Sequence, residues 1–570
     1  MNPLNNNSGR DDLLPPAPRR PRLEEAATGV CAGRDVNVYH QNQSPFLCLP
    51  YETKSMIIRC LGFREITRLA KVCRHLRDLV ENDKALERAW FRRFPSQHQY
   101  QLKTTIKRKD EQQLCDWLAP FADKDTVESL FKQRGSTYFP VQLLFTNSKL
   151  MSQCKKFKLA EKAKITHASY VTTATFSADS RRVMTASVDH KLKIYGQESG
   201  GTWEEKNTIT HDGSVMSASF STDGHHVSAT GCDKTFIIYS QADNGSWEAK
   251  ATIPHVPTAK SVTFTADGRR LVTAGTDHTV KIFGQGNNGS WELEDTIDHT
   301  TPIESARFSV DESLLAIHDT HFVVTTYGKG AAGKWVEKAT LQGTHIALAD
   351  ISADSCHLLT KDSGYKASIF NLQADGSWKK AVTISHDYIL ETATFSADSC
   401  HVVTASWDYK AKIYSRRADS SWQEKACITH KYEVISATFS ADCLHVVTIS
   451  KDNKAKISGL QADGSWRKQA SITHKEKILS ATFSADGRLV VTASADGTAR
   501  VFGLQTEGKW LEKATIRHER GVLSADFSPD DRYVVTISND YSARITELRK
   551  DDDDQMSITH LLSEASCLLF

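Results

Sequence analysis

The stretch ITHKYEVISATFSADCLHVVTISKDNKAKISGLQADGSW, residues 428–466, is one copy of a unit that recurs about every 44 residues. Three residue types mark the repeat and stay in phase. Tryptophans lie 44 residues apart with one step of 43: Trp203, Trp247, Trp291, Trp335, Trp378, Trp422, Trp466 and Trp510. A histidine series accompanies them: His167, His211, His255, His299, His386, His430, His474 and His518. The aspartate series is Asp189, Asp233, Asp277, Asp408, Asp452, Asp496 and Asp540. Three series in phase indicate one supersecondary unit copied many times.

Each unit contains four runs rich in Val, Ile, Thr and aromatic residues, separated by turn clusters such as Ser-Ala-Asp-Gly. Four short strands predict a small antiparallel sheet, and such sheets arranged radially form a β-propeller, whose closed ring protects the sheet edges. We count nine core units and predict a mainly β protein with a nine-bladed propeller over residues 159–570. Seven or eight blades, with the leftover repeats packed outside, is the alternative.

Closure of the ring requires one further outer strand, and the chain offers two. KLAEKAKITH, residues 158–167, precedes the first core unit, and QMSITHLLSEASCLLF, residues 555–570, follows the last. Both resemble the outer strand of a unit, and only one of them can pair with the ninth core.

The histidine and the aspartate of one unit are 22 residues apart, which places them on adjacent loops at one end of a blade. An imidazole N–H donated to a buried carboxylate, with a serine hydroxyl nearby, would satisfy all three polar groups. The serines are Ser187, Ser406, Ser450, Ser494 and Ser538. Metal binding or acid–base catalysis is the alternative, but catalysis needs one asymmetric site rather than many equivalent copies. We therefore predict structural clamps: His167 with Asp189, His211 with Asp233, His255 with Asp277, His430 with Asp452, His474 with Asp496 and His518 with Asp540.

The array resembles the WD-repeat family. The family has Gly-His before the first strand, Asp in the turn between the second and third strands, and Trp-Asp ending the third. Here Gly-His is Thr-His in most copies, and Trp-Asp is replaced, as in Tyr195-Gly196, Phe283-Gly284 and Tyr414-Ser415. The resemblance implies a binding platform, usually for a protein or peptide, and rarely an enzyme.

The 158 residues before the array divide by composition. Residues 1–45 are rich in Asn, Pro, Arg and Gly and predict a disordered arm. Residues 46–95 carry apolar residues at helical spacing and predict a bundle of short helices. Residues 96–158 predict a helical linker to which we assign no chemistry.

Residues 49–90 resemble the F-box family, whose pattern begins Leu-Pro-x-Glu and continues with spaced aliphatics and a Val-Cys pair. The matching positions, which the resemblance makes the adaptor-binding residues, are Leu49, Pro50, Glu52, Ile57, Leu61, Leu69, Val72, Cys73 and Leu76. The resemblance implies docking to a Skp-family adaptor of a cullin-RING ubiquitin ligase, with the propeller selecting the substrate. The alternative is a scaffold or assembly protein whose helical region merely caps the propeller.

Target contacts are expected where the loops depart from the repeat. Trp407 is the tryptophan of the array that stands outside the periodic register. Aromatic and basic residues near it in repeat phase are Tyr388, Tyr409, Lys431, Tyr432, Lys451, Lys475 and Lys477. Aromatic anchors beside cations suit a peptide carrying acidic or phosphorylated groups. Scattered exposed aromatics and solvated lysines are the equally weighted alternative.

Units four and five break the clamp pattern. At the phase of the turn aspartate they carry His321 and Gly364, while Asp319 and Asp362 come two positions earlier, and His345 comes two residues late. We interpret this as tolerance of the framework rather than as a specialised contact.

A net charge of +2 argues against a protein that coats nucleic acid, and no apolar run approaches the roughly 20 residues that span a bilayer. The 12 cysteines form no C-x-x-C pair, which predicts free thiols in a reducing compartment and no metal site. We expect no cofactor, no catalytic residue and a cytoplasmic location, with the nucleus as an alternative. The close similarity of the repeats also fits a bacterial effector that mimics a host F-box protein and acts in the host cytosol.

Overall fold

The computed structural model describes residues 154–550, apart from short gaps, and a few residues before them. The earlier residues are Lys54, Val72, Arg74–Asn82 and Met151. The gaps are 199–200, 222–223, 232–234, 243–244, 255–258, 266–267, 287–289, 331–332, 342–345, 363, 418, 462 and 506–507. The predicted arm, most of the helical segment and linker, and the tail from 551 lie outside the described residues, as do Leu49, Pro50, Glu52, Ile57, Leu61, Leu69, Cys73, Asp233, His255 and His345.

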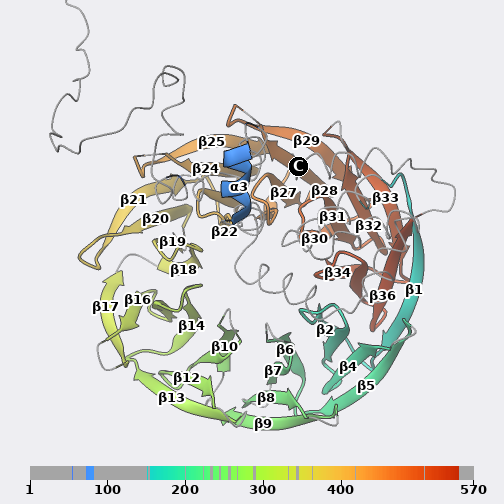
Figure 1. Ribbon diagram of the computed structural model, residues 1–570, viewed down its shortest axis with the longest axis horizontal. Helices are drawn as coiled ribbons and strands as arrows, with labels where there is room; N and C mark the ends of the chain where they lie inside the picture. The colour runs from blue at the N-terminus through green and yellow to red at the C-terminus, as the bar shows by residue number, and fades with distance from the viewer. Residues whose placement is uncertain are drawn as a thin grey trace, which may run out of the picture. The chain divides into compact units, whose positions relative to one another are not determined.

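Within the described residues, the repeat array forms nine four-stranded sheets. The sheets stand around a circle in Figure 1, each with its first strand toward the centre and its fourth along the rim. The protein is therefore a nine-bladed β-propeller, and the predicted blade number is confirmed.

The first three blades are built as follows. Blade 1 comprises β2 (Val171–Phe176), β3 (Arg182–Ser187), β4 (Lys191–Gln197) and β5 (Trp203–Thr210). Blade 2 comprises β6 (Val215–Phe220), β7 (His226–Gly231), β8 (Thr235–Gln241) and β9 (Trp247–Pro254). Blade 3 comprises β10 (Ala259–Phe264), β11 (Arg270–Gly275), β12 (Thr279–Gln285) and β13 (Trp291–Asp298).

The next three blades follow the same plan. Blade 4 comprises β14 (Ile303–Phe308), β15 (Leu314–Asp319), β16 (Val324–Lys329) and β17 (Trp335–Leu341). Blade 5 comprises β18 (Ile346–Ile351), β19 (His357–Asp362), β20 (Lys366–Leu372) and β21 (Trp378–Ser385). Blade 6 comprises β22 (Leu390–Phe395), β23 (His401–Ser406), β24 (Lys410–Arg416) and β25 (Trp422–Thr429).

The last three blades differ in how the ninth is completed. Blade 7 comprises β26 (Val434–Phe439), β27 (His445–Ser450), β28 (Lys454–Leu460) and β29 (Trp466–Thr473). Blade 8 comprises β30 (Ile478–Phe483), β31 (Leu489–Ser494), β32 (Thr498–Leu504) and β33 (Trp510–Arg517). Blade 9 comprises β34 (Val522–Phe527), β35 (Tyr533–Ser538), β36 (Ser542–Lys550) and, as its outer strand, β1 (Phe157–Thr166).

The ring closes through the N-terminal strand. β1 pairs antiparallel with β36, from Phe157 opposite Lys550 to Thr166 opposite Ser542. Of the two outer strands that the sequence offers, the one before the first core unit therefore completes blade 9. In Figure 1 the two strands lie side by side although they come from opposite ends of the array.

The periodic tryptophans pack blade against blade. Trp466 at the start of β29 contacts Phe439 of its own blade, with ring centroids 5.9 Å apart. It also receives the edge of the His401 ring from blade 6, at 5.6 Å and 87°. Edge-to-face contacts of this kind add to the free energy of burial. The histidine that begins the second strand makes the same contact in His226–Trp291, His357–Trp422 and His445–Trp510. This histidine was not among the residues predicted from the sequence.

The closing interface substitutes a tyrosine for that histidine. Tyr533 of blade 9 meets Trp203 of blade 1 edge-to-face at 5.4 Å, and the amide of Gln197 donates a hydrogen bond to its hydroxyl at 2.6 Å. Residues of both blades share one apolar cluster that includes Val183, Ile165 and Val535. The last blade is thus held to the first by the same packing that joins the others.

A buried charge cluster is specific to this closure. Glu547 of β36 is fully buried, and its carboxylate accepts hydrogen bonds from Arg532 and, at 2.7 Å, from Arg549. The ammonium of Lys162 on β1 lies 2.9 Å from the same carboxylate. Burial raises the pKa of Glu547, but the charge of Arg532 and the hydrogen bonds from Lys162 outweigh it, so the net pKa is lowered. The closing strand is therefore held by charge as well as by backbone pairing.

We predict that Glu547→Ala lowers the stability of the propeller by about 3 kcal/mol, because it leaves Arg532 buried without its carboxylate. The measurement is the melting temperature by calorimetry. Arg467→Ala is the matched control, since its pair with Asp463 is exposed and such pairs contribute at most about 1 kcal/mol. Equal, small effects of the two changes would contradict this account of the closure.

Candidate protein-binding surface

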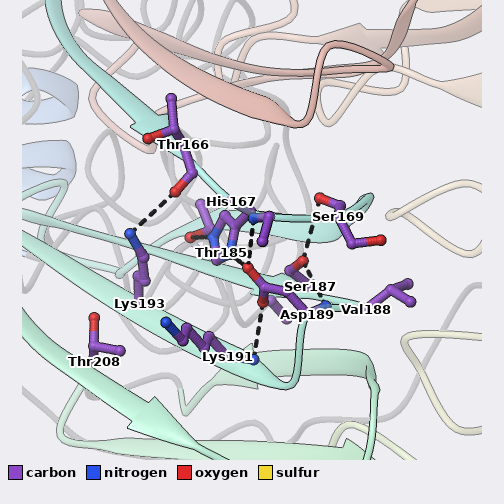
Figure 2. Close-up of polar contacts among 12 residues, drawn as sticks. Thr166, His167, Ser169, Thr185, Ser187, Val188, Asp189, Lys191, Lys193 and Thr208 are labelled. Atoms are coloured by element: carbon purple, nitrogen blue, oxygen red, sulfur yellow. Dashed lines mark hydrogen bonds and ion pairs between the residues drawn. The ribbon is translucent and has the colours of Figure 1, made fainter.

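One end of each regular blade is tied together by the histidine–aspartate pair. In blade 1 the Nδ1–H of His167 donates to the Asp189 carboxylate at 2.9 Å (Figure 2). Because Nδ1 carries the proton, Nε2 accepts from the hydroxyl of Thr185, also at 2.9 Å. The carboxylate further accepts from the backbone N–H groups of Ala168 at 2.9 Å and Lys191 at 3.0 Å. One aspartate thus fixes the loop before the first strand and the turn after the second.

A serine hydroxyl is the third member of the clamp and holds the turn that carries the aspartate. The hydroxyl of Ser187 accepts from the N–H of Asp189 at 3.1 Å and donates to the carbonyl of Ser169 at 3.4 Å, both visible in Figure 2. The threonine that hydrogen-bonds Nε2 was not among the residues predicted from the sequence. Its recurrence four residues before the aspartate was the available signal: Thr185, Thr404, Thr448, Thr492 and Thr536.

The same contacts recur around the ring with graded distances. The Nδ1–carboxylate distances are 2.8 Å for His386–Asp408, 3.1 Å for His474–Asp496 and 3.3 Å for His518–Asp540. In blade 7 the nearest approach of His430 to Asp452 is 3.5 Å. The clamp of blade 7 is therefore the loosest of these.

The irregular units keep part of the clamp. In blade 4 the Nδ1 of His299 lies 3.1 Å from the hydroxyl of Thr301, which in turn donates to the buried carboxylate of Asp319 at 2.5 Å. In blade 5, Asp362 accepts from the N–H of Lys366 at 2.9 Å. The displaced aspartates still brace their turns, which agrees with tolerance of the framework.

The clamps hold a neutral imidazole beside a charged carboxylate. Burial lowers the pKa of His167, His386, His474 and His518 despite the nearby carboxylates, and lowers that of His430 to about 4. Burial raises the pKa of Asp496, but hydrogen bonds from Thr498 and the Lys475 N–H outweigh it and bring it to about 2. Within the described residues no group of three or more His, Cys, Asp or Glu side chains is arranged to hold a metal ion.

We predict that the propeller loses stability as the pH falls from about 6.5 toward 4. The unfolded chain takes up protons near the ordinary histidine pKa of about 6.5, whereas the folded clamps resist them. Stability is therefore complete above that pKa and falls through the window below it. The clamp carboxylates add to the loss only below about pH 4, where unfolded aspartate is protonated. Calorimetry from pH 8 to pH 4 measures this, and a melting temperature unchanged between about pH 6.5 and 4.5 would contradict it.

An aromatic ladder stands on the loops above the clamps of blades 5 to 7. Tyr388 stacks on Trp407 with centroids 6.4 Å apart and planes at 19°. On its other side it stacks on Tyr365 at 5.9 Å and 7°. The ammonium of Lys451 lies 4.3 Å from the centroid of the Trp407 ring and 3.7 Å from the carboxylate of Glu433. These three predicted residues, Tyr388, Trp407 and Lys451, are thus brought together.

The other predicted residues lie exposed on neighbouring loops of the same blade end. They are Tyr409, Lys431, Tyr432, Lys475 and Lys477. Tyr365 was missed because it follows Gly364 in an irregular turn. Its position one residue after the turn-aspartate phase, shared with Tyr409, was the signal that could have found it.

Tyr409 occupies a backbone conformation that bulky residues rarely adopt. Its φ is 70°, in the left-handed region, where sister turns carry Asn453 and Gly497 but also His190, His278, Phe322 and Tyr541. A side chain of this size costs roughly 1 kcal/mol there. The left-handed conformation is thus a feature of the repeated turn, and Tyr409 is set apart by its place beside the ladder.

The described part of the helical segment is α3 (Arg74–Asn82) with Val72 just before it. Val72 is 69% exposed, whereas Leu76 is 3% exposed. Val72 is therefore available to a partner, and Leu76 is a core position of this segment. No helix among the described residues is long and apolar enough to cross a membrane.

Comparison with family models identifies both parts of the chain. Residues 46–88 match the F-box domain. The WD domain, G-beta repeat, matches residues 161–196, 203–240, 249–284, 466–503 and 511–546. The chain therefore has the organisation of an F-box/WD-repeat protein. This combination is that of an F-box substrate-adaptor type of protein.

Solved structures similar to this chain include a WD40 domain and two Sqt1 proteins, all at low identity. No curated protein matches the chain significantly. The C-terminal WD40 domain of Sif2 is 13% identical, with a TM-score of 0.46 over 69% of this chain and 99% of that one. Sqt1 from Chaetomium thermophilum is 16% identical, with a TM-score of 0.47 over 69% of this chain and 99% of that one. Sqt1 from Saccharomyces cerevisiae is 13% identical, with a TM-score of 0.46 over 70% of this chain and 100% of that one.

Proposed function

We propose that this protein is the substrate-recognition subunit of an SCF-type cullin-RING ubiquitin ligase. The observation that carries the proposal is an F-box domain at residues 46–88 placed ahead of a closed propeller. The F-box would dock a Skp-family adaptor, and the propeller would hold the target.

In this role the protein acts by proximity. Holding a target near the ubiquitin-loaded enzyme raises its effective concentration without any bond-making group in this chain. The proposal agrees with the chemistry of the blade 1 clamp, whose imidazole and carboxylate are engaged in hydrogen bonds to one another, to the Thr185 hydroxyl and to the backbone. We therefore propose a non-catalytic adaptor.

The target would contact the aromatic–basic surface, which we define as Tyr365, Tyr388, Trp407, Tyr409, Lys431, Tyr432, Lys451, Lys475 and Lys477. Stacked rings present large apolar area at low entropic cost, as hot spots of interfaces do. Lys431, Lys475 and Lys477 are exposed and suit acidic or phosphorylated groups.

A scaffold without a ubiquitin role is the second candidate. It would use the same surface, because the propeller presents it whether or not the F-box docks an adaptor. The two candidates differ only in what residues 46–95 bind.

We predict that the full chain binds a purified Skp-family adaptor and that Val72→Asp weakens this binding by about tenfold or more, since a charge would replace an exposed apolar contact. Leu49→Asp and Ile57→Asp should act in the same direction. Binding is measured by calorimetric titration, with Val336→Asp on the outer strand of blade 4 as the control for an exposed valine elsewhere. Absence of binding, or indifference to all three changes, would favour the scaffold.

We predict that Trp407→Ala and Tyr432→Ala reduce target capture while leaving adaptor binding unchanged. Proximity labelling with and without residues 46–95 identifies the target, and a pull-down with purified target then measures each variant. Tyr409→Asn should also reduce capture, yet keep a melting temperature at or above that of the unmodified protein, because asparagine tolerates the left-handed conformation. Unchanged capture by all three variants would remove this surface from the proposal.

A further inference from the structure

The outer face of the blades carries a second recurring contact, between the third and fourth strands. In blade 1 the ammonium of Lys193 donates to the carbonyl of Thr166, the residue before the clamp histidine, at 3.0 Å. It also lies 3.5 Å from the carboxylate of Glu205, twelve residues along the chain. The hydroxyl of Tyr195 donates to the same carboxylate at 3.0 Å. Cation, carboxylate and backbone carbonyl form one unit.

Other blades repeat this arrangement. The cation-to-carboxylate distance is 3.9 Å for Lys412–Glu424 in blade 6 and 3.8 Å for Arg500–Glu512 in blade 8. In blade 9 the partner comes from the closing strand, where Glu161 lies 3.3 Å from Arg544. Tyr414 donates to Glu424 at 3.0 Å, as Tyr195 does to Glu205.

Blade 7 retains the cation and lacks the carboxylate. The ammonium of Lys456 donates to the carbonyl of Thr429, so its head group is fixed as in the sister blades. Lys468 stands at the position of Glu424, and Ser458 replaces the tyrosine. Two ammonium groups therefore stand on adjacent strands, at the positions where blades 1, 6 and 8 hold an ion pair.

The electrostatics of blade 7 follow from this exchange. Burial and then the charge of Lys468 lower the pKa of Lys456, with Lys454 adding to the effect and Asp452 opposing it. After burial, the charge of Lys456 is the main cause that lowers the pKa of His430. The excess positive charge is thus felt by the neighbouring clamp, which is the loosest of the series.

We propose that Lys456 and Lys468 form an anion-binding subsite on the outer face of blade 7, which accepts a side-chain carboxylate from an acidic segment of a partner protein. The sister blades show the occupant, because there a glutamate carboxylate sits beside the equivalent cation. Blade 7 has given up its own carboxylate, and a partner supplies one to complete the ion pair. Two ammonium groups around one carboxylate make charge-assisted hydrogen bonds on both sides.

This subsite is separate from the aromatic–basic surface and does not rest on the ubiquitin-ligase role. It lies on strands β28 and β29 rather than on the loops above the clamps. It would hold an acidic stretch of a bound target, or of any other partner that reaches this side of the propeller.

The test uses the full chain and a fluorescein-labelled hexaglutamate peptide, with binding followed by fluorescence anisotropy at low ionic strength. Lys468→Glu recreates the sister arrangement, so the variant should fold with an equal or higher melting temperature. We expect it to lose about tenfold or more in affinity, because one cation is removed and the other is neutralised. Affinity within about twofold of the unmodified protein would overturn the proposal.

The reciprocal change provides the matched control. Glu424→Lys gives blade 6 the pair of cations found in blade 7, and we expect a second equivalent of bound peptide. Absence of that second equivalent from the folded variant would overturn the argument from the sister blades. Lys250→Glu reverses an exposed cation on the outer strand of blade 2 and should leave peptide affinity unchanged. Trp407→Ala tests the aromatic–basic surface. If it abolishes binding while Lys468→Glu does not, the peptide is held by the aromatic–basic surface and the subsite is wrong.

Discussion

The pairing of β1 with β36 is the constraint on which the rest of the structure depends. A four-stranded blade is too small to be stable by itself and leaves an unpaired edge that invites association with other chains. Closing the ring buries the flank of every blade against a neighbour, and the strand that completes blade 9 comes from the other end of the array. The entropy lost in bringing distant segments together grows only slowly with their separation, so one well-made interface can hold the ring.

Two interactions make that interface specific. The first is the edge-to-face contact of Tyr533 with Trp203, which continues the packing of the other blades. The second is the Glu547 cluster, whose buried carboxylate is neutralised by Lys162 of β1, Arg549 of β36 and Arg532 just before β35. A shift of register would separate the buried carboxylate from its cations, and a buried charge without a partner is costly. The ion pairs therefore favour one register. Backbone pairing alone would not distinguish β1 from a similar outer strand.

The sequence predicted the repeat-level features because each is copied many times. A period of 44 residues with strand-like runs leads directly to a propeller, and the count of cores gave its nine blades. Features that occur once could not be predicted from the sequence in this way. Glu547, which holds the closing strand by charge, has no glutamate at the same position of the other repeats, and Tyr365 of the ladder sits in an irregular turn. The histidines that pack on the tryptophans of the next blade were overlooked although His357, His401 and His445 recur every 44 residues, because their spacing does not tell which residue of the next unit they contact.

The same reasoning explains why departures from the repeat carry the functional information. A framework residue in a repeat protein has sisters in identical surroundings, so each sister reports what that position requires for folding. Glu205, Glu424 and Glu512 report that a carboxylate beside the third-strand cation is compatible with the fold and stabilises it. Lys468 lacks that contact and places a like charge near Lys456, whose pKa it lowers. In blade 5 Lys380 occupies the same position, but there Ser368 replaces the third-strand cation. A substitution that destabilises the free protein and complements an anion is expected where a partner supplies the missing charge.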